Sequence, residues 1–286
     1  MRYEAPTTIN DAVKLLAGKA GVARVLAGGT DLLVQIRTER IAPDLVVDVK
    51  RIPAMRAVTA KNGAFRIGAA VSGAELGENK ALKKAWPGVV EAANLIGSTQ
   101  IQGRATLAGN LCNASPAADS VPALVAAGAK AVVAGPSGKR TVPVESVPTG
   151  PGRTSLAKGE IIEAILLDKR PPQAGDAYQR FIPRTEMDIA VVSAGVSLTL
   201  DDKGVVKAAR VAIGAAAPTV LLVEEAAEVL IGSKLDEATL QRLAKVCSGA
   251  CRPIDDKRGT IEFRRKVAGV LAKRVAAIAY KRAGGK

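Results

Sequence analysis

The sequence predicts an α+β protein of two domains, and three observations lead to this prediction. Before the stretch "LLDKRPPQAGDA", short apolar runs of strand character alternate with helical segments. Beyond it, two long alternating strands precede three segments of helical period. The stretch itself, with two prolines, a glycine and mixed charges, is typical of a domain boundary. We therefore expect one domain over residues 1–173 and another over residues 174–286, and a chain of 286 residues is long enough for both.

The first domain is predicted to begin with a helix, a strand and a turn. Thr7 or Thr8 can cap a helix through "INDAVKLLAG" that ends at Gly18. The next segment, "VARVLA", is typical of a short buried strand. Gly28 and Gly29 make the chain turn before "LLVQIR" resumes with helical character, and "DLVVDV" predicts a second strand.

Two hairpins and three helical segments are expected next. The Asn62–Gly63 pair between "MRAVTA" and "AFRIGAA" favours a tight primed turn, because both central residues of such a turn take positive φ. Helical segments are predicted at "GAELGENKALKKAW" and "GVVEAANLIG". Asp119 or Ser120 can cap a further short helix that ends near Gly128, and "KAVVAGPSGKRTVPV" predicts the second hairpin.

The second domain is predicted to be an antiparallel sheet followed by helices. Its strands are "DIAVVSAGVSLTL" and "VVKAARVAIGA", which alternate and are joined by the turn "DDKG". The segments "VEEAAEVLIG", "DEATLQRLAKVC" and "EFRRKVAGVLAKRVAAIAYKR" have helical period. The last of them is the densest basic run, and we interpret its charged side as a solvated helix face rather than a docking surface.

Composition argues against several classes of protein. The formal charge of +14 is spread along the whole chain, and one Trp, three Tyr and three Phe offer little for base stacking. This favours a basic surface for nucleotides or an acidic partner over nucleic-acid binding. The longest apolar stretches are interrupted by Lys, Arg or Gly before the roughly 20 residues of a membrane span. Because "MRYEAPTTIN" has no apolar leader core, we expect a cytoplasmic protein.

The chain contains no histidine and three cysteines, Cys112, Cys247 and Cys251. This set argues against a metal site within the chain, and we expect ordinary buried thiols. Without histidine the chain also lacks the usual general base. We therefore predict no catalytic residue and expect a bound cofactor to carry any reaction.

Two loops, "VLAGGTDLL" and "RATLAGNLCNASPAAD", are rich in small residues that let a backbone lie close to a ligand. Neither matches GxGxxG or a P-loop. Each places glycine-freed amides beside a hydroxyl, Thr30 in the first and Thr106 in the second, which suits phosphate oxygens. Two such loops favour a pyrophosphate, and so a dinucleotide. The other polar residues of the second loop are predicted to serve the sugar or ring portions, with Asp119 accepting from ribose hydroxyls: Asn110, Asn113, Ser115 and Asp119.

The carboxylate of Asp31 is unexpected in a phosphate cradle. If backbone amides and the Thr30 hydroxyl hold the ligand, the Asp31 side chain can turn back to cap its own helix or hold the loop. We therefore expect Asp31 to contribute its N–H group to the ligand.

At these loops the sequence resembles the FAD-binding (medium) subunits of the molybdenum hydroxylases, which include carbon monoxide and xanthine dehydrogenases. The matching stretches keep the family's order over essentially the whole chain: "VLAGGTDLL", "TLAGNLCNASPAADSVPALVAAGA", "GEII" and "RFIPRTEMDIAVVSAGVSL". The resemblance implies a two-lobed FAD-binding domain of the p-cresol methylhydroxylase or vanillyl-alcohol oxidase type. It also implies a C-terminal domain with a three-stranded antiparallel sheet and helices.

The resemblance also implies which residues bind the cofactor. Family members often place an aromatic residue against the isoalloxazine where this chain has Ile96, and either Arg180 or Arg184 matches a basic residue near the flavin or adenine end. Backbone amides of residues 27–31 and the loop hydroxyls would hold the pyrophosphate. The complete set is Arg24, Val25, Leu26, Ala27, Gly28, Gly29, Thr30, Asp31, Leu32, Ile96, Thr106, Gly109, Asn110, Asn113, Ser115, Asp119, Ile162, Arg180 and Arg184.

The function implied is that of an electron-transfer subunit. Hydroxylation would occur at a molybdenum cofactor in a large molybdopterin-binding subunit, and electrons would pass through two [2Fe–2S] clusters in a small subunit to FAD. The acceptor would be NAD, a quinone or oxygen, and the complex a dimer of heterotrimers. The cysteine-rich [4Fe–4S] insertion of one branch is missing. Two alternatives remain: a stand-alone FAD oxidoreductase, and a basic nucleotide- or nucleic-acid-binding module without a redox role.

Overall fold

A small parallel sheet and two helices form the N-terminal end of the molecule. The structure, a computed structural model, describes residues 1–18 and 21–285. The sheet has the order β1 (Arg2–Glu4), β3 (Leu45–Asp48), β2 (Ala23–Leu26), and both pairings are parallel. Helix α1 (Ile9–Ala17) begins at the Thr8 cap and ends at Gly18, as predicted. Helix α2 (Leu32–Arg37) follows the first loop. Strand β1 was not predicted.

The central part of the chain is built on an antiparallel sheet of order β4-β5-β10-β6-β7. The hairpin at Asn62–Gly63 is confirmed, with φ of 52° and 84° at the two residues. The second hairpin is confirmed as well. The strands are β4 (Val58–Lys61), β5 (Ala64–Gly68), β6 (Lys130–Gly135), β7 (Gly138–Pro143) and β10 (Ile161–Leu167).

Six short α-helices connect β5 to β6 in the described part of the chain. The single helix predicted for "GAELGENKALKKAW" is wrong, because Asn79 takes a non-helical conformation and caps a second helix through the Leu82 N–H. The helices are α3 (Gly73–Glu78), α4 (Lys80–Ala85), α5 (Pro87–Ala93), α6 (Thr99–Gln102), α7 (Leu107–Cys112) and α8 (Ser120–Ala126). Shorter elements are the 3₁₀ turns Pro53–Met55 and Val144–Ser146 and the strands β8 (Pro148–Gly150) and β9 (Arg153–Thr154).

The C-terminal part is a four-stranded antiparallel sheet packed between two layers of helices. Its order is β11 (Ala174–Phe181), β12 (Val192–Leu200), β13 (Val206–Gly214), β14 (Leu221–Leu222). The expected sheet of three strands is thus extended by a two-residue fourth strand. The predicted helices are present as α9 (Glu224–Leu230), α10 (Glu237–Ala250) and α11 (Ile261–Arg282).

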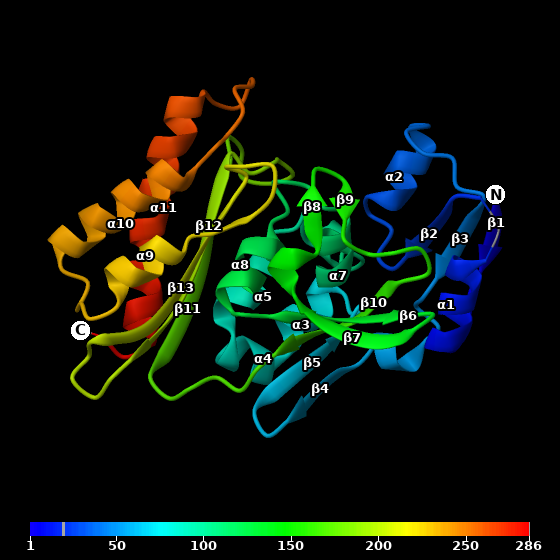
Figure 1. Cartoon of the computed structure of the whole chain (residues 1–286), viewed down its shortest axis with the longest axis horizontal. Coiled ribbons are helices and arrows are strands. Elements are labelled where there is room, and N and C mark those ends of the chain that lie inside the picture. The colour runs from blue at the N-terminus through cyan, green and yellow to red at the C-terminus, as the bar shows by residue number, and fades with distance from the viewer. Residues whose placement is uncertain (19–20, 286) are drawn as a thin grey trace.

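Helices from both parts of the chain cover this last sheet (Figure 1). Helices α5 and α8 pack on one side, and α11 packs against β11 and β12. Glycines allow the close approach on each side: a Cβ on Gly195 would lie 2.6 Å from the Pro122 carbonyl oxygen, and one on Gly175 would lie 1.9 Å from that of Ala279. Helices from both halves of the sequence therefore pack on this sheet.

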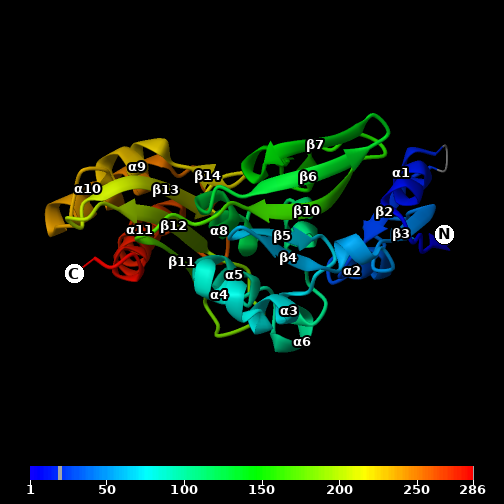
Figure 2. The ribbon, with the colours of Figure 1, turned by 90° about the horizontal axis from the view of Figure 1, so that it is seen from below.

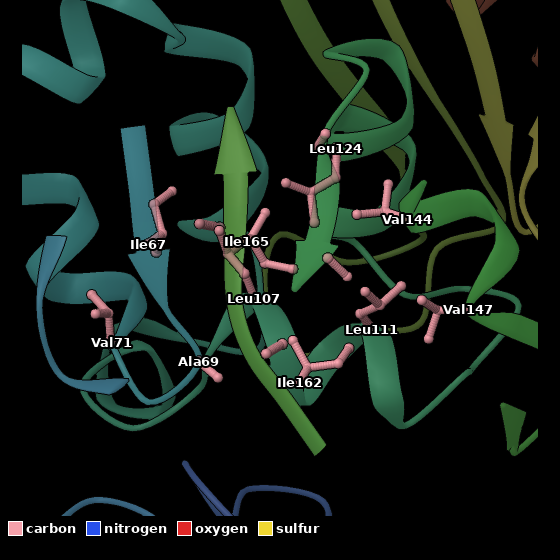
Figure 3. Close-up of a cluster of buried hydrophobic side chains, with 14 of the residues drawn as sticks. Ile67, Ala69, Val71, Leu107, Leu111, Leu124, Val144, Val147, Ile162 and Ile165 are labelled. Atoms are coloured by element: carbon pink, nitrogen blue, oxygen red, sulfur yellow. The ribbon is translucent and has the colours of Figure 1, made fainter. Parts of the chain in front are cut away.

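The three larger sheets follow one another along the molecule, with the chain termini at opposite ends (Figure 2). Buried residues form two apolar clusters, one beneath the first two sheets and one between the last sheet and α9–α11. In the first cluster, Leu107 and Leu111 of α7 pack beside Ile162 and Ile165 of β10 (Figure 3). No helix in the described part of the chain is long and apolar enough to cross a membrane.

Candidate functional site

A cleft of about 760 Å³ opens where the two predicted loops face each other. Such a volume is typical of small-molecule sites, which span about 300–1,000 Å³. Three stretches of chain provide most of the lining: residues 21–32, residues 105–113 and residues 152–162. The structure thus brings together two segments about eighty residues apart in sequence, as their composition predicted, and adds a third.

The first loop lines the cleft with backbone amides that have no partner in the protein. The N–H groups of residues 27–32 donate no hydrogen bond to any residue within 1–18 or 21–285. Gly29 has φ of +79°, a conformation that other residues rarely adopt, and Gly28 lies against the backbone of Arg104 and Ala105 in the second loop. Residues 27–30 and Leu32 are half-buried and Asp31 is exposed, so these donors are accessible from the cleft, and such a run of backbone amides is suited to an anionic ligand.

The prediction for the Asp31 side chain is wrong. Asp31 stands at the start of α2 in a helical conformation, and its carboxylate caps neither that helix nor any other N–H group of the described residues. A capping side chain requires an extended residue at the N-cap, whereas Asp31 has φ of −97° and ψ of −48°. The carboxylate lies at the cleft lining instead.

The second loop is partly helical, which the sequence reasoning did not predict. Thr106 caps α7 by accepting a hydrogen bond of 2.9 Å from the Gly109 N–H. Leu107 and Leu111, four residues apart, turn into the core (Figure 3). The opposite, half-buried side of α7 therefore lines the cleft with Gly109, Asn110 and Asn113.

Asn110, rather than Asp119 or Ser120, caps helix α8. Its Oδ1 accepts hydrogen bonds from the N–H and the hydroxyl of Ser120, at 3.0 and 2.7 Å. The predicted cap was wrong because the Asp119 side chain has another partner. In this arrangement the Asn110 Nδ2 group donates to no residue that the structure describes.

Asp119 lies outside the cleft lining, in a buried ion pair with Arg180 of β11 at 2.9 Å. Burial raises the pKa of the Asp119 carboxyl to about 6, although the Arg180 guanidinium acts in the opposite direction. Arg184 is exposed and pairs with Asp188 at 3.3 Å. Ser115 accepts from the Ala117 N–H at 3.2 Å. The predicted cofactor residues that do not line the cleft are Leu26, Ser115, Asp119, Arg180 and Arg184.

The third stretch was missed by the sequence reasoning apart from Ile162. It includes Gly152, with φ of +68°, and runs through "RTSLAKGE". Two hydrogen bonds from Arg140, both of 2.8 Å, lower the pKa of Glu160 to about 2. This carboxylate is therefore ionised, and both of its oxygens already accept a hydrogen bond from Arg140. The small and glycine-rich sequence "TGPGRTS" was the available signal for this wall.

The inner surface of the cleft is apolar. Ile96 lines it, as the sequence comparison implied, together with the buried Met55 and Ile162. No Phe, Tyr or Trp is among the described lining residues. Aliphatic side chains therefore provide the surface on which a flat ring can pack.

The cysteines have the environment of unreactive thiols. Burial raises the pKa of Cys247 to about 12 and that of Cys251 to about 11. Cys112 lines the cleft, and burial raises the pKa of its thiol to about 12. Within the described ranges, no three His, Cys, Asp or Glu side chains are grouped to hold a metal ion.

Comparison with known proteins covers nearly the whole chain. Residues 1–168 match the family described as the FAD binding domain in molybdopterin dehydrogenase, and residues 177–279 match the CO dehydrogenase flavoprotein C-terminal domain. The chain is 32% identical over 286 residues to the putative xanthine dehydrogenase FAD-binding subunit of Escherichia coli K12, covering 99% of this chain and 97% of that protein. It is 30% identical to the carbon monoxide dehydrogenase medium chain of Hydrogenophaga pseudoflava, covering 98% and 97%. A chain of reconstituted CO dehydrogenase from Oligotropha carboxidovorans superposes with a TM-score of 0.94 at 31% identity, covering 99% and 98%.

Proposed function

The chain belongs to the FAD-binding medium subunits of the carbon monoxide and xanthine dehydrogenase type, and we propose that it is the electron-transfer subunit of a molybdenum hydroxylase complex. Its relatives are dehydrogenase subunits, and its N-terminal part is an FAD-binding domain. The cleft in that domain is the site where we place the cofactor.

The observation that carries this assignment is the run of unpartnered N–H groups in residues 27–32, which lies across the cleft from α7. A pyrophosphate is the part of FAD that needs such donors. We assign it to these amides and the Thr30 hydroxyl on one side, and to Thr106, Gly109 and Asn110 on the other. Thr106 accepts from its own helix, and its hydroxyl hydrogen can still be donated to a phosphate oxygen.

The remaining cleft residues suit the other portions of the cofactor. Ile96, Met55 and Ile162 offer apolar surface to a ring, and Arg24 and Asn113 offer donors. Asp119 and Arg180 join the start of α8 to β11 behind the second loop. We therefore assign this pair to holding the loop rather than to the ribose contact expected of Asp119.

The complex we propose has two further subunits. A large molybdopterin-binding subunit would carry the hydroxylation site, and a small subunit would carry two [2Fe–2S] clusters, in a dimer of heterotrimers. When bound, FAD supplies the redox chemistry that passes electrons from these clusters to NAD, a quinone or oxygen. The proposal includes a two-lobed FAD domain of the p-cresol methylhydroxylase type that ends at residue 173. The second apolar cluster, which lies wholly beyond residue 173, supports this division, although the first cluster also includes Tyr178 and Ala212.

The test is FAD binding by the purified chain and by the chain co-expressed with both partner subunits. Wild-type protein should show flavin absorption and should co-purify with the molybdenum and [2Fe–2S] subunits. In Gly28→Ala, the added Cβ would lie 2.1 Å from the Arg104 carbonyl oxygen, so we expect at least about tenfold weaker FAD binding.

Gly249→Ala is the matched control, because a Cβ there, on α10, meets no atom within 4 Å. We expect this variant to bind FAD like wild type. A wild-type protein that takes up no FAD would overturn the proposed function. If the chain binds FAD, does not associate with either partner subunit and oxidises a substrate by itself, it is a stand-alone FAD oxidoreductase instead.

A further inference from the structure

Helix α2 continues directly from the amide-lined loop, yet it is weakly attached to the rest of the molecule. None of its side chains is buried, and Leu33 and Val34 are 52% and 58% exposed. Its backbone hydrogen bonds remain within residues 29–41. The position of the loop amides therefore depends on the few contacts that hold this segment against α7.

One of these contacts lies where the loop begins. The Gly28 backbone is so close to the second loop that an added Cβ would meet the Arg104 carbonyl oxygen at 2.1 Å and Ala105 Cα at 3.2 Å. This contact fixes one end of the segment. It leaves α2 able to pivot unless a second contact holds the other end.

Gln35 provides the second contact. Its Nε2 donates to the Asn113 Oδ1 at 3.0 Å, and both residues line the cleft. Among the described residues, this is the only hydrogen bond from α2 to a residue outside 29–41. It spans 78 positions in sequence and connects the helix after the first loop to the end of α7.

The bond also sets the orientation of the Asn113 amide. In this bond Gln35 donates through its Nε2, and Asn113 presents its carbonyl oxygen to Gln35. The Nδ2 group of Asn113 is then directed elsewhere as a donor. The arrangement thus favours a ligand that accepts hydrogen bonds, such as a phosphate or a sugar oxygen.

We propose that Gln35 is a positioning residue for the cofactor: it latches α2 to α7, fixes the width of the cleft and orients the Asn113 amide as a donor. The inference rests on the proposed FAD site. Without the latch, the first loop must be ordered when the cofactor binds, and this lowers the affinity.

The test compares FAD affinity in three single variants and one double variant. Gln35→Met keeps the length and volume of the side chain but removes the donor, and we expect about three- to tenfold weaker binding through faster release. Val34→Ala changes a neighbouring exposed residue of α2 that makes no side-chain hydrogen bond, and it should bind within about twofold of wild type. Asn113→Ala should weaken binding by itself.

Two readouts separate a positioning role from simple loss of structure. Gln35→Met added to Asn113→Ala should cause no further loss of affinity, because the partner of Gln35 is already gone. The visible circular dichroism of the bound flavin should change in Gln35→Met while the melting temperature of the apoprotein stays the same. If wild type binds FAD and Gln35→Met matches it in affinity and spectrum, the latch is wrong and the proposed function stands. If the wild-type protein binds no FAD, both the positioning role of Gln35 and the proposed function are wrong.

Discussion

Several polar side chains of the second loop are engaged by the protein itself. Thr106 caps α7, Asn110 caps α8 and Ser115 accepts from a neighbouring amide. Each of these groups acts as an acceptor in the fold and retains further capacity as a donor, through a hydroxyl hydrogen or an NH₂ group. The loop is therefore ordered before the cofactor arrives, which reduces the entropy lost on binding.

The Asp119–Arg180 pair gives a prediction for pH dependence at the scale of one residue. The folded protein holds the Asp119 proton up to a pKa of about 6, whereas the ordinary value is 3.8. Between these values the folded state binds more protons than the unfolded chain, so the free energy of unfolding falls as pH rises through this window and levels off above it. The change is on the order of 3 kcal/mol.

Urea unfolding at a series of pH values between 3.5 and 7.5 checks this prediction, with Asp119→Asn as the comparison. Other carboxyls titrate in the same range, and only the difference between the two proteins isolates Asp119. The wild-type curve should fall relative to that of the variant across the window. Parallel curves would show that Asp119 is ionised in the folded protein down to its ordinary pKa.

At the scale of one element, α7 depends on its buried side more than on its helix propensity. It has six residues, and Gly109 lies in its interior. Leu111 is fully buried and packs against the central sheet (Figure 3). We expect Leu111→Ala to lower the free energy of unfolding by about 2–5 kcal/mol and to weaken FAD binding, because α7 carries one wall of the cleft.

Denaturant unfolding and FAD titration measure the two effects of Leu111→Ala separately. Val270→Ala in α11 is the matched control, since Val270 is 40% exposed and lies far along the chain from the cleft. It should change stability by less than about 0.5 kcal/mol. If Leu111→Ala loses stability but binds FAD like wild type, α7 does not position the cofactor.

Elements with a clear period or a strong turn signal could be predicted from the sequence. The Asn62–Gly63 hairpin, the Thr8-capped helix and the last three helices are examples. Strand β10, "IIEAILL", was missed because it is buried on both faces and its apolar residues, interrupted only by Glu163, show no period. Strand β11 was missed because it begins directly after the two prolines that mark the boundary.

The parts of the candidate site that have a distinctive local sequence could be predicted. Glycines beside hydroxyls identified the two loops, and the structure brings them together at one cleft. The Asp119–Arg180 pair and the Gln35–Asn113 bond could not be foreseen, because each joins residues whose proximity only the tertiary fold determines. The Arg140–Glu160 pair in the third wall is of the same kind.

At the scale of the whole molecule, one buried and one partly exposed ion pair hold the C-terminal sheet and α11 against the helices of the first part. Arg170 pairs with Asp176 at 2.6 Å, donates to the Ala85 carbonyl oxygen and lies over the Trp86 ring at 4.8 Å. Arg282 of α11 pairs with Glu91 of α5 and donates to the Asp176 carbonyl oxygen at 2.9 Å. Both arginines therefore connect α11 and β11 to the segment around α5.

The Arg170–Asp176 pair should matter far more to stability than the exposed pairs of the surface. Its side chains are 12% and 4% exposed, so Arg170→Met leaves a buried carboxylate without its partner and should cost about 3–5 kcal/mol. Lys130→Met is the matched control, because Lys130 and Asp168 form an exposed pair at 2.7 Å whose loss should cost less than about 1 kcal/mol.

Calorimetry of both variants measures the loss of stability and reports whether the two parts of the molecule still unfold together. We expect Arg170→Met to separate the unfolding of the C-terminal part from that of the FAD-binding part. Equal, small losses of stability in the two variants would show that this buried pair does not hold the junction.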